Sequence, residues 1–268
     1  MWLAWVVLLL QPGGTAPRVF GDGISWVAVR GEHSLLISKT EVTNAQYNRC
    51  VLAGACTPPS YSGGCLKAAL GLPPHVGRFE ATRHPDDREV AAVQESVAEP
   101  VAEIFQHPDH PVVCVSWSQA GTYARWVGGR LPSWIEWNKA VGVHRFPWGD
   151  TPPSCDLAAL KADLIHASCG LLSTQSSCSR PQGNTPEGIC DLLGNVAEWL
   201  TDTGTHDEGT KMQQFLRQTA GGHWAWPADR IVEDFRIPWL EPFGDLWLGI
   251  RVVKNGEPPA DLGGHQGP

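Results

Sequence analysis

Residues 188–199 read GICDLLGNVAEW and bring two acidic side chains into one short stretch. Asp191 and Glu198 provide hard carboxylate oxygens, and the Gly-Asn turn between them allows the loop to fold around a single point. Backbone carbonyls of the same loop can then complete a shell of oxygen atoms, which is the shell that calcium prefers. The stretch therefore predicts a calcium-binding loop. The alternative from the residues alone is that Glu198 pairs with a neighbouring Arg and Asp191 caps a turn.

Helix signals occur at three places along the chain. Thr43, Ser116 and Ser133 each stand three residues before a Glu or Gln, which is the spacing of a capping box at a helix start. Glycines that can close a helix follow each start, at Gly54, at Gly128 with Gly129, and at Gly142. Short β-rich runs are found at 26–29, 35–38, 112–117 and 246–253. Short helices and strands with long loops between them indicate an α+β, loop-rich domain with little regular secondary structure.

Composition and charge exclude several classes of protein. The chain has 268 residues, with 20 Lys plus Arg against 28 Asp plus Glu, and its net charge of -8 repels nucleic-acid phosphates and anionic lipid surfaces. The 29 Gly, 22 Pro and 13 Trp are typical of a loop-rich globule and exclude a helical bundle, a coiled coil and a disordered chain. We expect one domain at residues 20–254, with an inserted loop at 58–109. The Gly- and Pro-rich tail at 255–268 is predicted to be disordered.

The N-terminus and the cysteines both indicate export. Residues 1–16 contain an apolar run at 3–10 that is too short to span a bilayer and matches the core of a signal peptide. The eight cysteines include no Cys-x-x-Cys pair, so disulfides are favoured over a zinc or redox motif. Proximity favours the pairs Cys155 with Cys169 and Cys178 with Cys190. A secreted, periplasmic or cell-envelope protein is therefore expected, and the alternative is a cytosolic protein with buried thiols.

Several short motifs lie in order along residues 41–251. They are EVTNAQY at 41–47, HPVVCVSW at 110–117, GRLPS at 129–133 with EW at 136–137, FPWGD at 146–150, GICDLLGNVAEW at 188–199, GGHW at 221–224 and GIR at 249–251. In this order they resemble the formylglycine-generating enzyme family, also called the sulfatase-modifying factor family. The resemblance implies a C-type-lectin-like α+β fold with little regular secondary structure, which agrees with the loop-rich expectation.

The resemblance also gives the calcium loop a set of ligands. In the family the corresponding segment binds structural calcium, which implies side-chain ligation by Asp191 and Glu198 and carbonyl ligation by Gly194 and Val196. A second family calcium site follows the FPWGD motif, where Asp156 stands. The stretch 167–179 contains no clear acidic partner for that second site.

Copper chemistry is not expected. The resemblance implies a copper ion held by two active-site cysteines after the GGHW motif, and a cuprous ion needs soft thiolate ligands. The stretch 226–236 contains no Cys, and no Cys follows Cys190 anywhere in the chain. We therefore expect no formylglycine generation by the family mechanism, so the domain is predicted to be a pseudoenzyme.

A second branch of the family holds a non-haem iron with three histidines. The closest pair of histidines here is His107 and His110, within the sequence HPDHP. Prolines beside both favour an extended turn with no shared helical face, so we expect loop histidines rather than metal ligands. Bound iron is therefore not expected either.

The segment 223–251 combines tryptophans with charged side chains, and the resemblance implies that it lines a substrate or ligand surface. Aromatic faces beside fixed charges suit the recognition of peptides or carbohydrates. The candidate ligand-binding residues are Trp226, Asp229, Arg230, Arg236 and Trp239. The alternative is that tryptophans fill the core, which we expect for Trp199, Trp224 and Trp247.

The leading hypothesis is an exported, calcium-stabilised domain that acts as a binding or accessory module for a peptide, a protein or a glycan. Neither a nucleic-acid partner nor a membrane span is expected. The competing hypothesis is a metal-dependent oxidoreductase of the formylglycine-generating or non-haem iron type. It would act on a protein or thiol substrate with other ligands, such as His223. A purely structural envelope protein is the third hypothesis.

Overall fold

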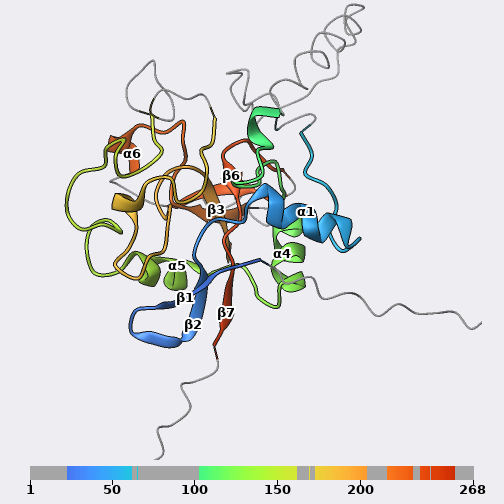
Figure 1. Ribbon diagram of the computed structural model, residues 1–268, viewed down its shortest axis with the longest axis horizontal. Coiled ribbons are helices and arrows are strands. Elements are labelled where there is room, and N and C mark those ends of the chain that lie inside the picture. The colour runs from blue at the N-terminus through green and yellow to red at the C-terminus, as the bar shows by residue number, and fades with distance from the viewer. Residues whose placement is uncertain are drawn as a thin grey trace, which may run out of the picture.

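The computed structural model describes residues 23–61, 65, 103–161, 169, 173–203, 216–231, 236–241 and 243–256. The expected signal peptide at 1–16, most of the expected insertion at 58–109 and residues 257–268 of the expected tail lie outside the described residues. Two β-sheets and several short helices alternate with long loops (Figure 1). The expected loop-rich α+β architecture is confirmed.

The smaller sheet joins segments from opposite ends of the described chain. Its strand order is β1 (Trp26–Val29), β2 (Glu32–Ser38) and β7 (Val253–Asn255), and β2 pairs antiparallel with both neighbours. The run expected at 26–29 is β1, and the run expected at 35–38 lies within β2. Asn255 was expected in the disordered tail, but it pairs with Leu35 as the last residue of β7.

The larger sheet contains the end of the 188–199 stretch. Its strand order is β5 (Arg236–Leu240), β4 (Leu216–Ala220), β3 (Ala197–Thr203) and β6 (Leu248–Gly249). β3 runs antiparallel to β4 and parallel to β6. Because β3 begins at Ala197, Glu198 is a strand residue in the middle of this sheet.

Three helices begin where the capping boxes predict. α1 (Asn44–Leu52), α4 (Trp117–Trp126) and α5 (Trp134–Val141) each follow a Ser or Thr whose hydroxyl accepts a backbone N–H, while the Glu or Gln side chain accepts the cap residue's own N–H. Glycines with positive φ follow each helix, as expected. α1 and α4 lie side by side (Figure 1). α5 packs against β3 and β4.

The strand expected at 112–117 is wrong. Val112, Val113 and Val115 are fully buried, but the segment bonds to other loops only at single points, such as the Val112 N–H to the Val42 carbonyl at 2.9 Å. Cys114 has a φ of 60°, which interrupts an extended strand. The segment is apolar because it crosses the core, and it ends where α4 begins.

The run expected at 246–253 is divided between the two sheets. Its first part contains β6 of the larger sheet, and its last residue begins β7 of the smaller sheet. The connecting residues Ile250, Arg251 and Val252 are all buried. A charged side chain therefore lies in the core at the point where the chain passes from one sheet to the other.

Tryptophans fill much of the core. Trp199 and Trp224 are buried, as expected, with exposed fractions of 0% and 7%. Trp137 is also fully buried and stacks on Trp134 with ring centroids 5.7 Å apart. Trp247 was also expected in the core, and it packs against the core but is only half-buried.

Every cysteine of the chain forms a disulfide. The pairs are Cys50–Cys56, Cys65–Cys114, Cys155–Cys169 and Cys178–Cys190. The last two confirm the pairing expected from proximity. A set of disulfides of this kind is typical of proteins that fold in an oxidising compartment. Among the described residues, no helix has both the length and the apolarity needed to cross a bilayer.

Candidate functional site

The 188–199 stretch is built around a buried ion pair between Glu198 and Arg251. Both side chains are 0% exposed, and the Arg251 Nε donates to the Glu198 Oε1 at 2.8 Å. The Glu198 Oε2 accepts the indole N–H of Trp137 at 2.6 Å. The other guanidinium nitrogens donate to the carbonyl oxygens of Ser38 at 2.9 Å and Cys190 at 2.8 Å. Arg251 thus connects β2, the 188–199 loop and β3.

Two further buried acids, Glu41 and Asp191, lie near this ion pair. Glu41 accepts hydrogen bonds from the Asn195 side chain at 2.8 Å and from the Val196 N–H at 3.2 Å. Burial raises the pKa of Glu41 well above its usual value, and the nearby Asp191 raises it further. Burial also raises the pKa of Asp191, whose carboxylate accepts the backbone N–H of Cys178. Three buried carboxyl groups therefore share one buried guanidinium, and the excess negative charge calls for protons or for a further cation.

The predicted calcium ligands fit an ion only in part. In the described part of the chain, no hydrogen bond reaches the carbonyl oxygens of Gly194 and Val196, so both are available. Glu198, in contrast, pairs with an Arg, as the alternative proposed. No group of three His, Cys, Asp or Glu side chains among the described residues is placed to hold a metal. A calcium ion in this loop would depend mainly on carbonyl oxygens, and the calcium site stays a prediction.

The residues present do not fit copper. All eight cysteines are paired in four disulfides, so the folded, oxidised chain offers no thiolate. Soft sulfur ligands are what a cuprous ion requires.

Four aromatic rings, beginning with the His of the GGHW motif, form a continuous row. His223 stacks on Trp247 with ring centroids 4.9 Å apart, and it lies 5.2 Å from the ring of Trp226. Trp247 meets Trp239 edge to face at 6.3 Å. The three tryptophans are each partly exposed, and the histidine between them is buried. We refer to Trp226, His223, Trp247 and Trp239 as the aromatic row.

His223 is held in a fixed orientation within the row. Its Nδ1 accepts the backbone N–H of Ala225 at 3.2 Å. Burial lowers the pKa of His223 to about 3, so the ring is neutral at physiological pH. A neutral, oriented imidazole presents a flat face to its neighbours and adds no charge to the row.

The remaining predicted ligand residues are dispersed. Asp229 is exposed on the short helix α6 (Ala228–Ile231). Arg236 is exposed at the start of β5, where its guanidinium lies over the ring of Trp134, 4.7 Å from the centroid. The side chain of Arg230 lies outside the described residues. The structure therefore links Trp226 to Trp239 through two rings that sequence reasoning did not place there, and it directs Arg236 towards Trp134.

His107 and His110 lie in a turn, as expected. Their ring centroids are 5.1 Å apart, and the His110 Nδ1 lies 3.0 Å from the Thr174 hydroxyl. Burial and the neighbouring His107 lower the pKa of His110. Because no third metal-binding side chain joins them within the described ranges, the two form a pair of loop histidines.

Residues 20–256 match the model of a family described as the sulfatase-modifying factor enzyme 1-like domain. The chain belongs to this family. The resemblance carried by the motifs is thereby confirmed, and so is the expected fold.

The chain is also similar to parts of several curated enzymes, and two of them illustrate the range. A formylglycine-generating enzyme from Thermomonospora curvata is 46% identical over 168 residues, which are 59% of this chain and 47% of the enzyme. A hercynine oxygenase from Mycolicibacterium thermoresistibile is 33% identical over 170 residues, which are 54% of this chain and 36% of the oxygenase. The matched part thus spans less than half of each of these enzymes.

A solved structure supports the fold independently. PvdO from Pseudomonas aeruginosa superposes with a TM-score of 0.52, covering 83% of this chain and 80% of PvdO, at 19% sequence identity. At this identity the likeness concerns the fold alone.

Sequence reasoning missed the partners that complete both parts of the site. Glu41 and Arg251 belong to the EVTNAQY and GIR motifs, but nothing local indicates that their side chains meet Glu198 or its loop. A charged residue within an otherwise apolar run, as Arg251 is in LGIRVV, was the available signal, because such a residue is buried only with a partner. Trp247 has no comparable signal, because it stands in a turn between two apolar residues, Leu246 and Leu248.

Proposed function

We propose that this sulfatase-modifying-factor domain binds a peptide, a protein or a glycan through the aromatic row and does not generate formylglycine. In this proposal it is an exported accessory module that its disulfides and a calcium ion stabilise. The observation that carries the proposal is the complete pairing of the cysteines, because the copper chemistry of the family requires free thiols. Without those thiols the fold can still present a binding surface, and the aromatic row is the candidate.

The aromatic row supports a binding role by its exposure and rigidity. Partly exposed tryptophans offer large flat faces at little cost in side-chain entropy, and such faces dominate many binding sites. Charged side chains lie close to the row, because Arg217 of β4 pairs with Trp239 of β5 and forms an ion pair with Glu241 at 2.8 Å. Flat rings beside fixed charges suit a ligand with both apolar faces and polar groups.

The second candidate function is a metal-dependent oxidoreductase that acts on a protein or thiol substrate. The names of the two curated relatives favour it. Its metal would need ligands other than thiolates, and His223 is the first choice, because a neutral imidazole is a common metal ligand. This proposal has weaker support, since the Nδ1 of His223 is already occupied and no three-residue ligand group surrounds it in the described part of the chain.

Metal analysis separates the two functions. We expect the purified protein, after exposure to calcium, copper and iron and exhaustive dialysis, to retain about one or two calcium ions per chain and neither copper nor iron. Elemental analysis measures all three metals in one sample. Copper or iron near one per chain, together with oxygen consumption in the presence of a cysteine-containing peptide, would favour the oxidoreductase, and an alanine variant of His223 would then be the next measurement.

Substitutions in the aromatic row test the binding role. We expect Trp226→Ala and Trp239→Ala each to weaken ligand binding about tenfold or more, because partly exposed tryptophans are frequent energetic centres of interfaces. Glycan and peptide arrays probed with the labelled protein would provide the ligand, and titration of each variant would give the change in Kd.

Trp148→Ala is the matched control for these variants. Trp148 is also partly exposed, but it stacks on Phe146 in a turn outside the row. If Trp226→Ala and Trp239→Ala bind the ligand as tightly as the control Trp148→Ala does, the aromatic row is not the ligand surface.

A further inference from the structure

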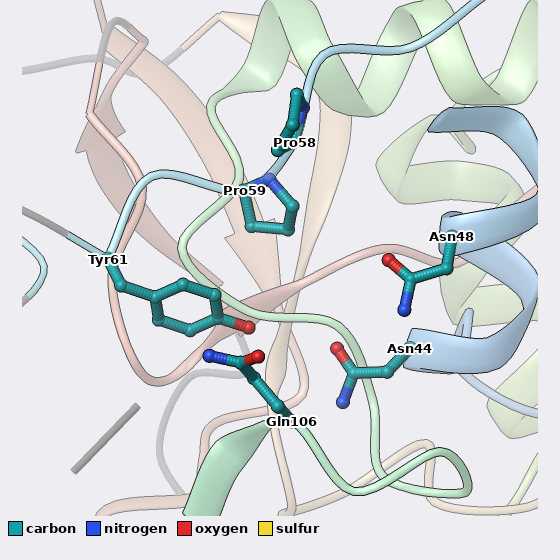
Figure 2. A pocket seen from close by; sticks show the side chains of 6 residues that line it. All are labelled: Asn44, Asn48, Pro58, Pro59, Tyr61 and Gln106. Carbon is teal, nitrogen blue, oxygen red and sulfur yellow. The ribbon is translucent and has the colours of Figure 1, made fainter. Parts of the chain in front are cut away.

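A separate pocket of about 240 Å³ lies beside α1, and neither the aromatic row nor the buried acids contribute to it. The residues that line it are Asn44, Asn48, Pro58, Pro59, Tyr61 and Gln106. Figure 2 shows the Tyr61 hydroxyl directed between the side chains of Gln106 and Asn44, with the two prolines forming one wall. Asn44 and Asn48 are four residues apart on α1, so they occupy the same face of the helix.

One wall of the pocket is fixed by Asn44. Its side-chain nitrogen donates to the carbonyl oxygens of Phe105 at 2.8 Å, His107 at 3.0 Å and His110 at 3.3 Å. These bonds attach the loop that contains Gln106 to α1. Because Asn44 is 4% exposed and already occupied, it acts as the frame of the pocket, and Asn48 and Gln106 are its exposed amide groups.

The opposite wall, residues 57–61, is fixed at both ends. Cys50–Cys56 holds its beginning to the end of α1, and Cys65–Cys114 follows it. Between them, the Gln119 side chain donates to the Thr57 hydroxyl and to the Pro58 carbonyl, each at 3.0 Å, and the Ser60 N–H donates to the Cys114 carbonyl at 3.1 Å. A wall held in this way loses little entropy when a ligand enters.

The chemistry of the lining selects a class of ligand. Among the residues that the structure describes, no charged side chain lines the pocket, which disfavours ionic ligands. The two exposed amides each present a donor and an acceptor side by side, and the Tyr61 hydroxyl does both. Burial raises the pKa of Tyr61 to about 12, so this hydroxyl keeps its proton at physiological pH. Two proline rings and the tyrosine ring add apolar faces.

We propose that this pocket binds one neutral sugar residue. Adjacent hydroxyl groups of a sugar ring present alternating donors and acceptors that match the amides of Asn48 and Gln106, and the C–H faces of the ring match Pro58, Pro59 and Tyr61. The volume suits one ring rather than a long ligand, since pockets for drug-sized molecules start at about 300 Å³. An extended peptide fits less well, because it is usually held by the backbone of a sheet edge and none of these lining residues lies in a strand.

Ligand-observed NMR on the full chain tests the pocket, with glucose, galactose, mannose and N-acetylglucosamine as separate probes. We expect saturable binding of at least one sugar with a Kd of about 1 mM, as few non-hydrogen atoms make contact. Asn48→Ala and Gln106→Ala should each weaken it about 2- to 10-fold, which corresponds to the loss of one or two hydrogen bonds. Tyr61→Phe, which removes only the hydroxyl, should act in the same direction.

Asn138→Ala is the matched control, because Asn138 is also an exposed Asn within a helix, on α5. Alanine favours helix at both positions, so Asn48→Ala and its control are expected to fold. Binding that is weakened in the pocket variants and unchanged in Asn138→Ala and Trp226→Ala supports the proposal and separates this pocket from the aromatic row. The proposal is overturned if none of the four sugars binds, or if the pocket variants bind sugar as tightly as the unmodified chain does.

Discussion

Replacing Arg251 with methionine is expected to lower the free energy of unfolding by about 3–5 kcal/mol. The substitution keeps an unbranched apolar stem but removes the guanidinium, so Glu198 would keep its place in the core without a counter-charge. The carbonyl oxygens of Ser38 and Cys190 would also lose their donors. Equilibrium unfolding in urea, followed by tryptophan fluorescence under oxidising conditions, measures the change.

Two further variants show whether the effect arises from the buried pair. Arg130→Met breaks an ion pair with Glu136 whose Arg side chain is 43% exposed, and we expect a loss below about 1 kcal/mol. Adding Glu198→Gln to Arg251→Met removes the unpaired charge and should recover part of the loss. A loss for Arg251→Met no greater than that for Arg130→Met would show that the buried pair does not support the core.

Removing the Cys65–Cys114 disulfide, by Cys65→Ser with Cys114→Ser, is expected to destabilise the domain by about 4 kcal/mol. The bond joins residues 49 apart in sequence, and opening it releases a long loop in the unfolded chain. The loss should appear as a lower urea midpoint under conditions in which the other three disulfides remain intact.

The Cys50–Cys56 disulfide provides the comparison for this experiment. It joins residues only 6 apart, so the same reasoning gives about 2 kcal/mol for Cys50→Ser with Cys56→Ser. The four sulfurs belong to residues that are all buried, so differences in burial contribute little to the comparison. Equal losses for the two double variants would mean that loop closure does not determine the contribution of these bonds.

The sequence predicted the features that depend on residues close together in the chain, namely three helix starts and two disulfides. The capping boxes at Thr43, Ser116 and Ser133 defined three helix starts, because each box is a reciprocal contact between residues three apart. The pairs Cys155–Cys169 and Cys178–Cys190 followed from proximity in the same way. The Cys65–Cys114 pair was not predicted, because its two residues are 49 apart and proximity in sequence gives no sign that they meet.

Tertiary contacts determined the features that the sequence did not reveal. β5 contains an Arg and a Pro, and β4 contains an Arg, so neither has the apolar pattern of a strand, and each is a strand because it lies beside its neighbour in the larger sheet. The segment 112–117 has a strand-like composition, yet it only crosses the core. The sequence indicated Trp226 and Trp239 as members of the candidate ligand surface. It did not indicate that His223 and Trp247 lie between them, because that contact arises only in the folded chain.

Arg251 also sets an order of events during folding. Its partner Ser38 precedes it by 213 residues, and the buried acids at Glu41, Asp191 and Glu198 are likewise synthesised before it. The disulfides between residues 12 and 14 apart need only nearby chain and can close early. The three carboxylates have no counter-charge until Arg251 has been synthesised. We therefore expect them to stay hydrated, and this part of the core to stay open, until then. Because these contacts join distant parts of the sequence, we expect the core around Arg251 to close after the two local disulfides have formed.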